Sequence, residues 1–265
     1  MNRITTTFQK LAAAKKKALV GYLTAGDPNP ETSFEILRAA CGAGIDILEL
    51  GVPFSDPTAD GPVIQVASQR ALRSGMTLSK TIDLAARLRK EVDTPIMLFG
   101  YYNPLFKYGL ERLAKAASAA GVDGLLVVDL PPEEAAPLKA ALQGTDIQII
   151  LLVAPTTRPD RVQKIANETG GFLYLITKAG TTGEGGLDYS AIAKHAAEVK
   201  AVSPLPVCLG FGIRNGDDAH KLAPMADGII VGSTLVNIIG NNPGAPDLPA
   251  RMAEKIRDLR AGLDS

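Results

Sequence analysis

Short apolar runs alternate with helix-like stretches along all 265 residues, and this alternation limits the possible folds more than any other feature. The runs lack polar alternation, which is typical of parallel strands covered on both faces. We expect strands at Leu19–Thr24, Ile45–Leu50, Ile96–Phe99, Gly124–Asp129, Ile147–Val153, Phe172–Thr177, Val207–Gly210 and Gly228–Val231. We expect helices at Glu31–Ala43, Leu78–Glu91, Glu111–Ala120, Glu133–Gln143, Arg158–Glu168, Tyr189–Val199, Gly216–Leu222 and from Thr234 onward.

Eight strands that are each followed by a helix predict an α/β fold of the closed (β/α)8 TIM-barrel type. An open doubly wound sheet fits the same alternation and is the alternative. We expect an extra N-terminal helix through Ile4, Phe8 and Leu11 and an appended C-terminal helix at Leu248–Leu263. Because no linker, low-complexity segment or short repeat interrupts the pattern, residues 1–265 are expected to form a single domain.

Composition and charge exclude several classes of function. The chain is 46% hydrophobic, which suits an ordinary globular core. Lys plus Arg and Asp plus Glu balance at 28 each, so there is no basic field for nucleic acid. No apolar stretch approaches the roughly 20 residues of a membrane span, and the run after Lys15-Lys16-Lys17 is too short for a targeting signal. We expect a soluble, cytoplasmic protein.

The cysteines and histidines predict no metal site. Cys41 and Cys208 lie far apart in apolar contexts, which is typical of buried thiols in a reducing compartment and not of a disulfide or metal framework. His195 and His220 lie on helix-like stretches away from the glycine-rich loops. A histidine-based metal site and a Ser-His-Asp triad are therefore disfavoured.

A carboxylate ends the second expected strand, in the segment Glu49-Leu-Gly-Val-Pro-Phe-Ser-Asp-Pro-Thr-Ala-Asp-Gly61. If Leu48 and Leu50 face the helices, strand alternation points Glu49 inward at the mouth of the barrel. Desolvation there raises the pKa of a carboxyl group, as a general acid or base near neutral pH requires. The alternative is a structural carboxylate that holds backbone amides of the next loop.

Two more carboxylates, Asp56 and Asp60, follow in the same loop. Asp60 is a candidate catalytic group, but Asp-Gly-Pro before a helical run is also a common start of a helix. Asp56-Pro57 is equally good turn chemistry. Local spacing alone leaves both interpretations open.

Glycine-rich loops follow the last three expected strands. They are Gly180-Thr-Thr-Gly183-Glu-Gly-Gly186, Gly210-Phe-Gly212 and Gly232-Ser233, the last at the start of a helix. Glycine lets backbone N–H groups approach an anion, and a helix N-terminus adds a favourable dipole. Because phosphate sites in such barrels often use the loops after strands 7 and 8, we predict a phosphate site here. Tight turns without a ligand are the alternative.

Aromatic residues gather at the strand ends, namely Tyr22, Phe99, Tyr101, Tyr174 and Phe211. Each alone is more often a core residue, but together they would line an apolar, flat-walled pocket beside the glycine-rich loops. The predicted ligand therefore carries a phosphate at one end and a sizeable ring at the other.

A rival chemistry depends on Lys178, four residues beyond Tyr174 and in phase with it. A lysine there could form a Schiff base with a carbonyl substrate, as in metal-free aldolases. A solvent-facing loop lysine is the more ordinary interpretation.

The stretch Glu49–Pro62 closely resembles the signature of the tryptophan synthase alpha chain family. The similarity extends across nearly the whole chain, through Gly21–Asp27, Val128–Pro131, Gly210–Ile213 and Gly232-Ser233. The resemblance implies a lyase that cleaves indole-3-glycerol phosphate to indole and glyceraldehyde 3-phosphate by a retro-aldol route. It implies no metal or organic cofactor for that half-reaction.

The resemblance also implies roles for individual residues. Glu49 would be the general acid and base, delivering a proton to indole C3 and accepting one from the glycerol hydroxyl. Asp60 would stabilise or accept the indole N–H proton, and Tyr174 would lie against the substrate. The phosphate would be held by Gly183, Gly210, Gly212, Gly232 and Ser233.

A partner follows from the same resemblance: a beta chain that carries pyridoxal phosphate, in an alpha2beta2 tetramer, to which indole passes internally. The residues expected to face it are Pro53, Asp56, Asn103, Pro104 and Asp129. Thr58 stands where the family usually has Leu, and Thr177–Gly183 departs from the usual Ser-x-x-Gly-Val-Thr-Gly. Both departures concern loop closure and signalling to the partner. A Schiff-base aldolase and a non-catalytic phosphate-binding subunit that only activates a partner remain as alternatives.

Overall fold

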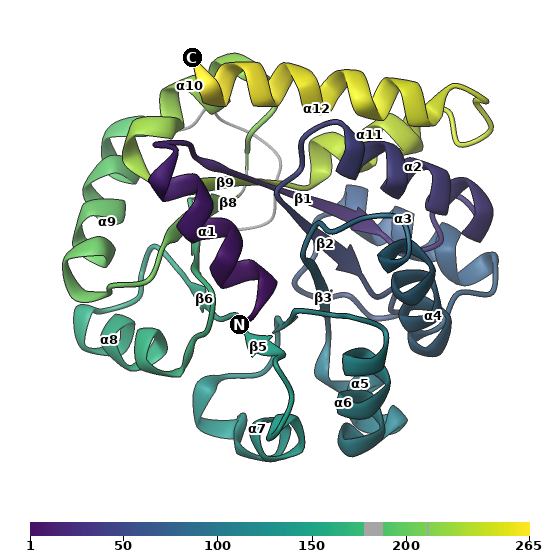
Figure 1. Ribbon diagram of the computed structural model, residues 1–265, viewed down its shortest axis with the longest axis horizontal. Coiled ribbons are helices and arrows are strands. Elements are labelled where there is room, and N and C mark those ends of the chain that lie inside the picture. Colours follow the sequence, from purple (N-terminus) through teal and green to yellow (C-terminus); the bar gives the residue numbers. More distant parts are fainter. Residues whose placement is uncertain (178–187, 211) are drawn as a thin grey trace.

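The computed structural model describes residues 1–177, 188–210 and 212–265. Its strands form one parallel sheet in the order β5-β4-β3-β2-β1-β9-β8-β7-β6 (Figure 1). The strands are β1 Ala18–Thr24, β2 Ile47–Gly51, β3 Ile96–Gly100, β4 Gly124–Val127, β5 Gln148–Ile149, β6 Leu152–Val153, β7 Leu173–Ile176, β8 Val207–Gly210 and β9 Gly228–Val231. The first and last strands, β1 and β9, pair with each other, as a barrel requires.

The expected strand Ile147–Val153 consists of two short segments, β5 and β6, at the two ends of the sheet order. β5 pairs with β4, and β6 pairs with β7. Between them, the Ile150 N–H donates to the Leu125 carbonyl at 2.9 Å, and the Tyr174 N–H donates to the Leu151 carbonyl at 3.2 Å. The ring of strands therefore closes within this run. The predicted closed barrel is confirmed, and the open doubly wound sheet is excluded.

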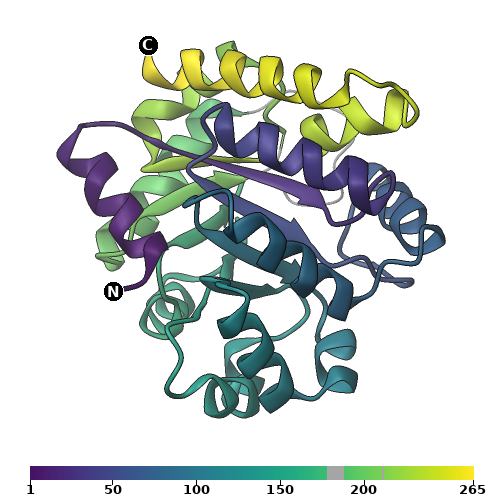
Figure 2. The same cartoon turned by 45° about the vertical axis from the view of Figure 1, so that its right-hand side comes forward.

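Helices surround the strands on the outside (Figures 1 and 2). The α-helices are α1 Arg3–Ala13, α2 Pro30–Gly42, α3 Pro62–Arg73, α4 Leu78–Arg89, α5 Tyr102–Tyr108, α6 Leu110–Ala119, α7 Ala136–Leu142, α8 Pro159–Glu168, α9 Tyr189–Val202, α10 Gly216–Leu222, α11 Ser233–Asn241 and α12 Leu248–Asp264. Two short 3-10 helices are η1 Pro132–Glu134 and η2 Ala223–Met225. No helix in the described ranges is long and apolar enough to cross a membrane.

Helix α5 was not expected from the sequence, while the helical run expected after Asp60-Gly-Pro62 forms α3. The other helices match the expectation closely. Both α3 and α5 carry a proline in the first turn, namely Pro62 and Pro104, respectively. Proline is tolerated there because its missing N–H would have no partner within the helix. The loops after β2 and β3 therefore lead directly into α3 and α5, which hold their ends in place.

Strand alternation divides the apolar residues into two layers. Leu48 and Leu50 pack in the outer layer between the sheet and the helices. Ile47 packs in the inner layer with Met97 and Cys208 from other strands. Successive side chains point to opposite faces of a strand, so Glu49 shares the inward direction of Ile47. The predicted orientation of Glu49 is confirmed.

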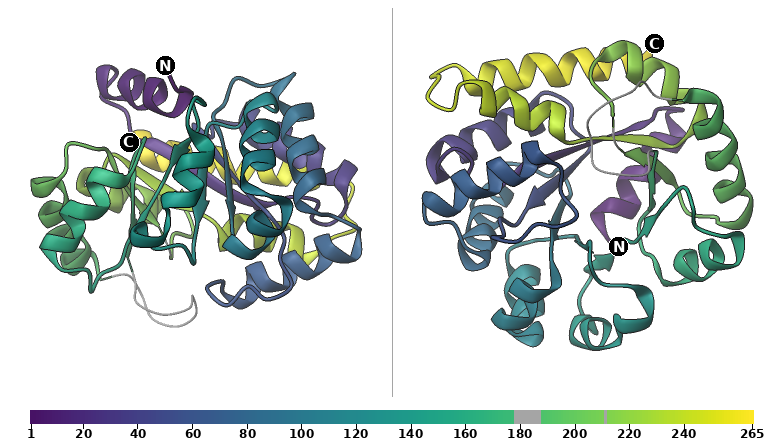
Figure 3. Two further views of the ribbon diagram at one scale, coloured as in Figure 1. Left: turned by 90° about the horizontal axis from the view of Figure 1, so that it is seen from below. Right: turned by 180° about the vertical axis from the view of Figure 1, so that it is seen from behind.

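Helix α1 covers the amino ends of the strands, as Figure 3 (left) shows. Phe8 is buried, and its ring centroid lies 5.5 Å from that of Phe172 inside the barrel. The Asn2 side chain caps α1 by accepting the Ile4 N–H at 2.8 Å, and its amide donates to the Asp123 carbonyl at 2.7 Å. The helix thus closes this end, and a ligand must enter at the opposite, carboxyl end of the strands.

We predict that Phe8→Ala lowers the free energy of unfolding by about 3 kcal/mol, because it empties a buried position beside Phe172. Urea unfolding of the variant measures this loss. Phe106→Ala is the matched control, because the Phe106 side chain is 63% exposed and its removal should cost less than about 0.5 kcal/mol. Equal losses in the two variants would contradict the packing of α1.

Candidate active site

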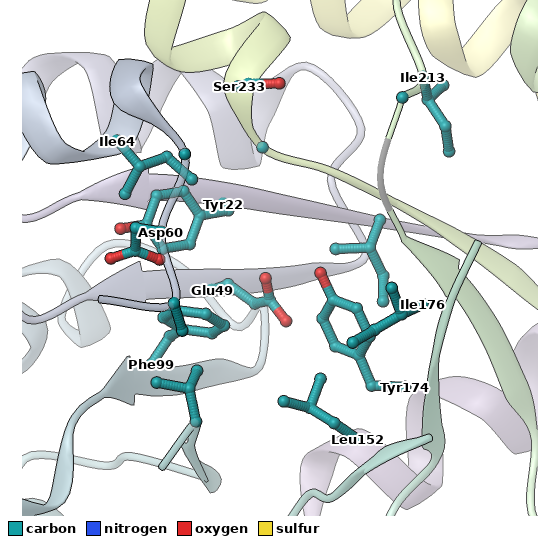
Figure 4. A pocket seen from close by; sticks show the side chains of 16 residues that line it. Tyr22, Glu49, Asp60, Ile64, Phe99, Leu152, Tyr174, Ile176, Ile213 and Ser233 are labelled. Carbon is teal, nitrogen blue, oxygen red and sulfur yellow. The ribbon is translucent and has the colours of Figure 1, made fainter. Parts of the chain in front are cut away.

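A cavity of about 220 Å³ lies at the carboxyl ends of the strands (Figure 4). It is lined by Tyr22, Glu49, Ala59, Asp60, Gly61, Ile64, Phe99, Val128, Leu152, Tyr174, Ile176, Gly212, Ile213, Ile230, Gly232 and Ser233. No lysine, arginine or histidine lines it among the described residues. The cavity is therefore an apolar chamber whose titratable groups are two carboxyls and two tyrosines.

Glu49 is buried, and its two carboxyl oxygens accept no hydrogen bond from any described residue. Its side chain points toward the Tyr174 ring across the cavity (Figure 4). Burial without a compensating charge raises the pKa of Glu49 from 4.5 to about 8. This carboxyl is therefore a proton donor at neutral pH. The alternative of a structural carboxylate that holds backbone amides is not supported by any bond of the described residues.

Asp60 lies in the loop before α3 and is also buried. Desolvation raises its pKa from 3.8 to about 6, while hydrogen bonding to Tyr101 opposes the rise. The Asp60 carbonyl accepts the Gln65 side-chain amide at 2.8 Å, which ties the loop to the first turn of α3. Asp60 thus lies just before a helix and also lines the cavity.

The two cavity carboxyls have separated pKa values, about 8 for Glu49 and about 6 for Asp60. Between these values Glu49 is mostly protonated and Asp60 mostly ionised. One carboxyl can therefore donate a proton while the other stabilises a positive charge.

Tyr22 and Phe99 form one wall of the cavity, with ring centroids 5.1 Å apart in an edge-on arrangement. A Cβ atom on Gly51 would come within 2.3 Å of the Tyr22 hydroxyl, so glycine at position 51 makes room for that ring. Tyr174 forms the opposite wall, buried on β7. These flat walls suit a planar aromatic ring.

Backbone N–H groups at the start of α11 form the polar end of the cavity. Gly232 precedes the helix and Ser233 begins it, and both line the cavity. Gly212, with a φ of 83°, lines it from the loop after β8. The Thr234 hydroxyl donates to the Ile213 carbonyl at 2.6 Å and joins this loop to α11. A helix N-terminus beside a glycine turn suits an anionic group.

Two predicted ligand residues lie behind the cavity wall. Gly210 is buried, and a Cβ atom on it would come within 2.4 Å of the Tyr174 ring, so Gly210 accommodates that tyrosine. Tyr101 is buried outside the cavity, where its hydroxyl accepts the Ala59 N–H at 3.0 Å. Phe211, Gly183 and Lys178 lie outside the described residues.

Several cavity residues were not among the sequence-based candidates. Val128, Leu152, Ile176 and Ile230 share the inward direction of the inner layer. The alternation that places Glu49 could have identified them. Ile64 and Ile213 come from α3 and a loop, where strand alternation gives no signal.

The five residues expected at a partner interface differ in exposure. Asp56, Asn103 and Asp129 are exposed, Pro104 is half-buried and Pro53 is buried. The Asp129 carboxylate accepts the Tyr102 N–H at 2.7 Å at the start of α5. This bond joins the loops after β3 and β4, and the bond from the Ala59 N–H to Tyr101 joins the loop after β2 to them. The exposed residues of these loops lie on the same side as the cavity mouth.

A closed parallel barrel that places two carboxyls of separated pKa at the mouth, beside a helix N-terminus, has the geometry of an acid–base enzyme of the (β/α)8 class. Comparison with known proteins is more specific. The family model described as tryptophan synthase alpha chain matches residues 8–262. A tryptophan synthase alpha chain from Desulfosudis oleivorans is 54% identical over 98% of both chains, and one from Desulfatibacillum aliphaticivorans is 49% identical over 98% of both.

Solved structures show the same likeness. Tryptophan synthase subunit alpha from Legionella pneumophila str. Paris is 38% identical, with a TM-score of 0.93, and the match covers 100% of this chain and 99% of that one. A chain of tryptophan synthase from M. tuberculosis is 32% identical, with a TM-score of 0.89, over 100% and 99% of the two chains. This chain belongs to the tryptophan synthase alpha chain family, and its activity is the lyase half-reaction that cleaves indole-3-glycerol phosphate.

We predict that Glu49→Gln makes the protein more stable at high pH. Because the pKa of Glu49 is about 8 in the folded chain and near 4.5 in the unfolded chain, the wild type loses stability as pH rises between these values. The variant should exceed the wild type by about 5 kcal/mol at pH 9 and match it below pH 4.5. Glu111→Gln, at an exposed position on α6, is the control. Urea unfolding across this pH range measures the difference, and a pH-independent gap would contradict the shifted pKa.

Proposed function

We propose that Glu49 and Asp60 carry out the retro-aldol cleavage of indole-3-glycerol phosphate in this chain. The observation that supports this most is the buried Glu49 carboxyl, whose oxygens have no partner among the described residues. Burying such a carboxyl group lowers the free energy of unfolding. Its presence in a cavity therefore favours a role in proton transfer to a bound ligand.

The reaction begins when Glu49 transfers its proton to indole C3. Positive charge then develops on the ring nitrogen, and the ionised Asp60 stabilises it through the indole N–H. The glycerol hydroxyl on the carbon attached to C3 gives its proton back to Glu49, and the bond between that carbon and C3 breaks. The electron pair of this bond restores the indole ring, and the hydroxyl carbon becomes the aldehyde of glyceraldehyde 3-phosphate. The indole ring itself accepts the electrons.

The aromatic walls and the polar end of the cavity would bind different parts of this substrate. Tyr22, Phe99 and Tyr174 would hold the indole ring, while Gly212, Gly232 and Ser233 would hold the phosphate at the start of α11. Binding energy at the phosphate is remote from the bond that breaks, so it positions C3 against Glu49. Gly183 and Phe211 complete the proposed set of ligand residues, while Gly210 and Tyr101 would act from behind the cavity wall.

We predict a bell-shaped pH dependence of kcat/KM for indole release. The rate should rise through pH 6 as Asp60 ionises and fall through pH 8 as Glu49 loses its proton. Glu49→Gln should lower kcat at least about 1,000-fold with little change in substrate affinity, since it removes the proton donor but keeps the shape. Indole release from pH 5 to 9, with binding measured by calorimetry, tests both statements.

Retained turnover in Glu49→Gln would contradict this assignment. Borohydride trapping with substrate then distinguishes the remaining chemistry: reduction onto Lys178 would support a Schiff-base aldolase. A wild-type chain without lyase activity, whose stimulation of a partner survives Glu49→Gln, would support a non-catalytic subunit.

We also infer that the chain works in the cytoplasm with a beta chain in an alpha2beta2 tetramer, and that pyridoxal phosphate belongs to the beta chain. Support comes from the exposed positions of Asp56, Asn103 and Asp129 beside the cavity mouth. A partner seated there would cover the site, and indole could leave without entering solvent. Pro53 is buried, so it would act on the partner only through its neighbours in the loop.

If this face binds the beta chain, Asn103→Ala should raise the apparent Kd for the beta chain about fivefold, a typical loss of affinity for one interface side chain. Stimulation of indole release, titrated with the beta chain, measures this Kd. Asn167→Ala, exposed on α8, is the control and should leave the Kd unchanged. If Asn103→Ala leaves the Kd for the beta chain unchanged, this face is not the interface.

A further inference from the structure

The loop that carries Asp60 has an anchor outside the cavity, the side chain of Tyr101. This residue follows β3 and directly precedes α5. Its side chain is buried, and its ring centroid lies 5.2 Å from that of Phe54. Tyr101 does not line the cavity formed by the described residues, and its hydroxyl bonds the loop that carries Asp60.

The hydrogen bonds of the Tyr101 hydroxyl have a defined direction. The Ala59 N–H donates to the hydroxyl oxygen at 3.0 Å. A hydroxyl has one proton, and here that proton is free to be donated elsewhere. The remaining partner is the Asp60 side chain, and this hydrogen bond opposes the rise that burial causes in the pKa of Asp60. Tyr101 therefore joins two successive residues of the loop, the backbone of one and the side chain of the next.

The other groups that face Asp60 cannot replace this bond. Tyr22 on β1 interacts with Asp60 through charge, as does Tyr174 on β7, and Glu49 on β2 is itself a carboxyl. The Tyr22 hydroxyl is paired with that of Thr24, 3.4 Å away. Among the described residues no cationic side chain lines the cavity, so nothing else there offsets the burial of Asp60.

We propose that Tyr101 is a positioning residue of the lyase reaction: its hydroxyl fixes the Asp60 carboxylate and the adjacent loop backbone at the cavity edge where the indole nitrogen binds. This inference rests on the proposed role of Asp60. It changes the expected role of Tyr101 from a substrate contact to a group that acts through Asp60. The aromatic ring alone would keep the loop packed on Phe54, so the hydroxyl carries the function.

Tyr101→Phe tests the proposal, because it keeps the ring and removes one hydroxyl. The acid limb of the kcat/KM profile for indole release should move up by about one pH unit, the usual effect of losing a hydrogen bond to a charged group. At pH 6 this lowers kcat/KM about fivefold, with most of the loss in kcat. Tyr108→Phe is the matched control on α5, where the ring packs against Arg112, and its profile should match the wild type.

A second readout does not depend on activity. In protein labelled with ¹³C at aspartate carboxyls, the Asp60 resonance, assigned by its loss in Asp60→Asn, should titrate about one pH unit higher in Tyr101→Phe than in wild type. Thermal unfolding reports whether the variants are folded. A Tyr101→Phe profile and Asp60 titration that both match the wild type would overturn the proposal.

The two proposals fail in different ways. If Asp60→Asn keeps full indole release, the proposed function of Asp60 is wrong, whatever Tyr101→Phe does. If Asp60→Asn is inactive while Tyr101→Phe behaves as the wild type in both readouts, only the positioning role is wrong. A lowered rate in Tyr101→Phe with an unmoved acid limb and an unmoved Asp60 titration would make Tyr101 merely structural, which also overturns the proposal.

Discussion

The site depends on one unfavourable interaction, the burial of the Glu49 carboxyl without a partner among the described residues. A charged carboxylate there would lose its hydration without an opposing charge, so the neutral form persists to about pH 8. The surrounding structure maintains this state. Inward apolar side chains such as Ile47 and Met97 fill the barrel below Glu49, and α1 closes the far end. The stability given up at Glu49 is recovered in this packed interior.

Much of the fold follows from the sequence because apolar runs and their alternation determine it. The inward direction of Glu49 follows from the phase of Leu48 and Leu50, and it is confirmed. The division of Ile147–Val153 into β5 and β6 was not predictable, because it depends on how the ring closes between strands distant in sequence. Likewise α5 was not predicted, because the residues around Pro104 in its first turn suit a turn as well as a helix.

The candidate site was less predictable where a role depends on contacts between loops. Tyr101 belongs by sequence to the same set of aromatic strand ends as Tyr22, yet its hydroxyl turns to Ala59 and Asp60. Gly210 fits a phosphate loop by its neighbours, yet its missing side chain makes room for Tyr174. In both cases the deciding partner is distant in the sequence: it lies in the loop before α3 for Tyr101 and on β7 for Gly210. Sequence spacing predicts that such residues lie near the site, but only the folded structure shows what each one contacts.

Infrared difference spectroscopy of the wild type against Glu49→Gln tests the central claim most directly, since it reports the protonation of one carboxyl without substrate or turnover. The account predicts the C=O band of a protonated carboxylic acid at pH 6, lost with a midpoint near pH 8. Carboxylate bands already present at pH 6, with a midpoint near the ordinary value of about 4.3 for glutamate, would contradict it. In that case the acid that protonates indole C3 would have to be another group.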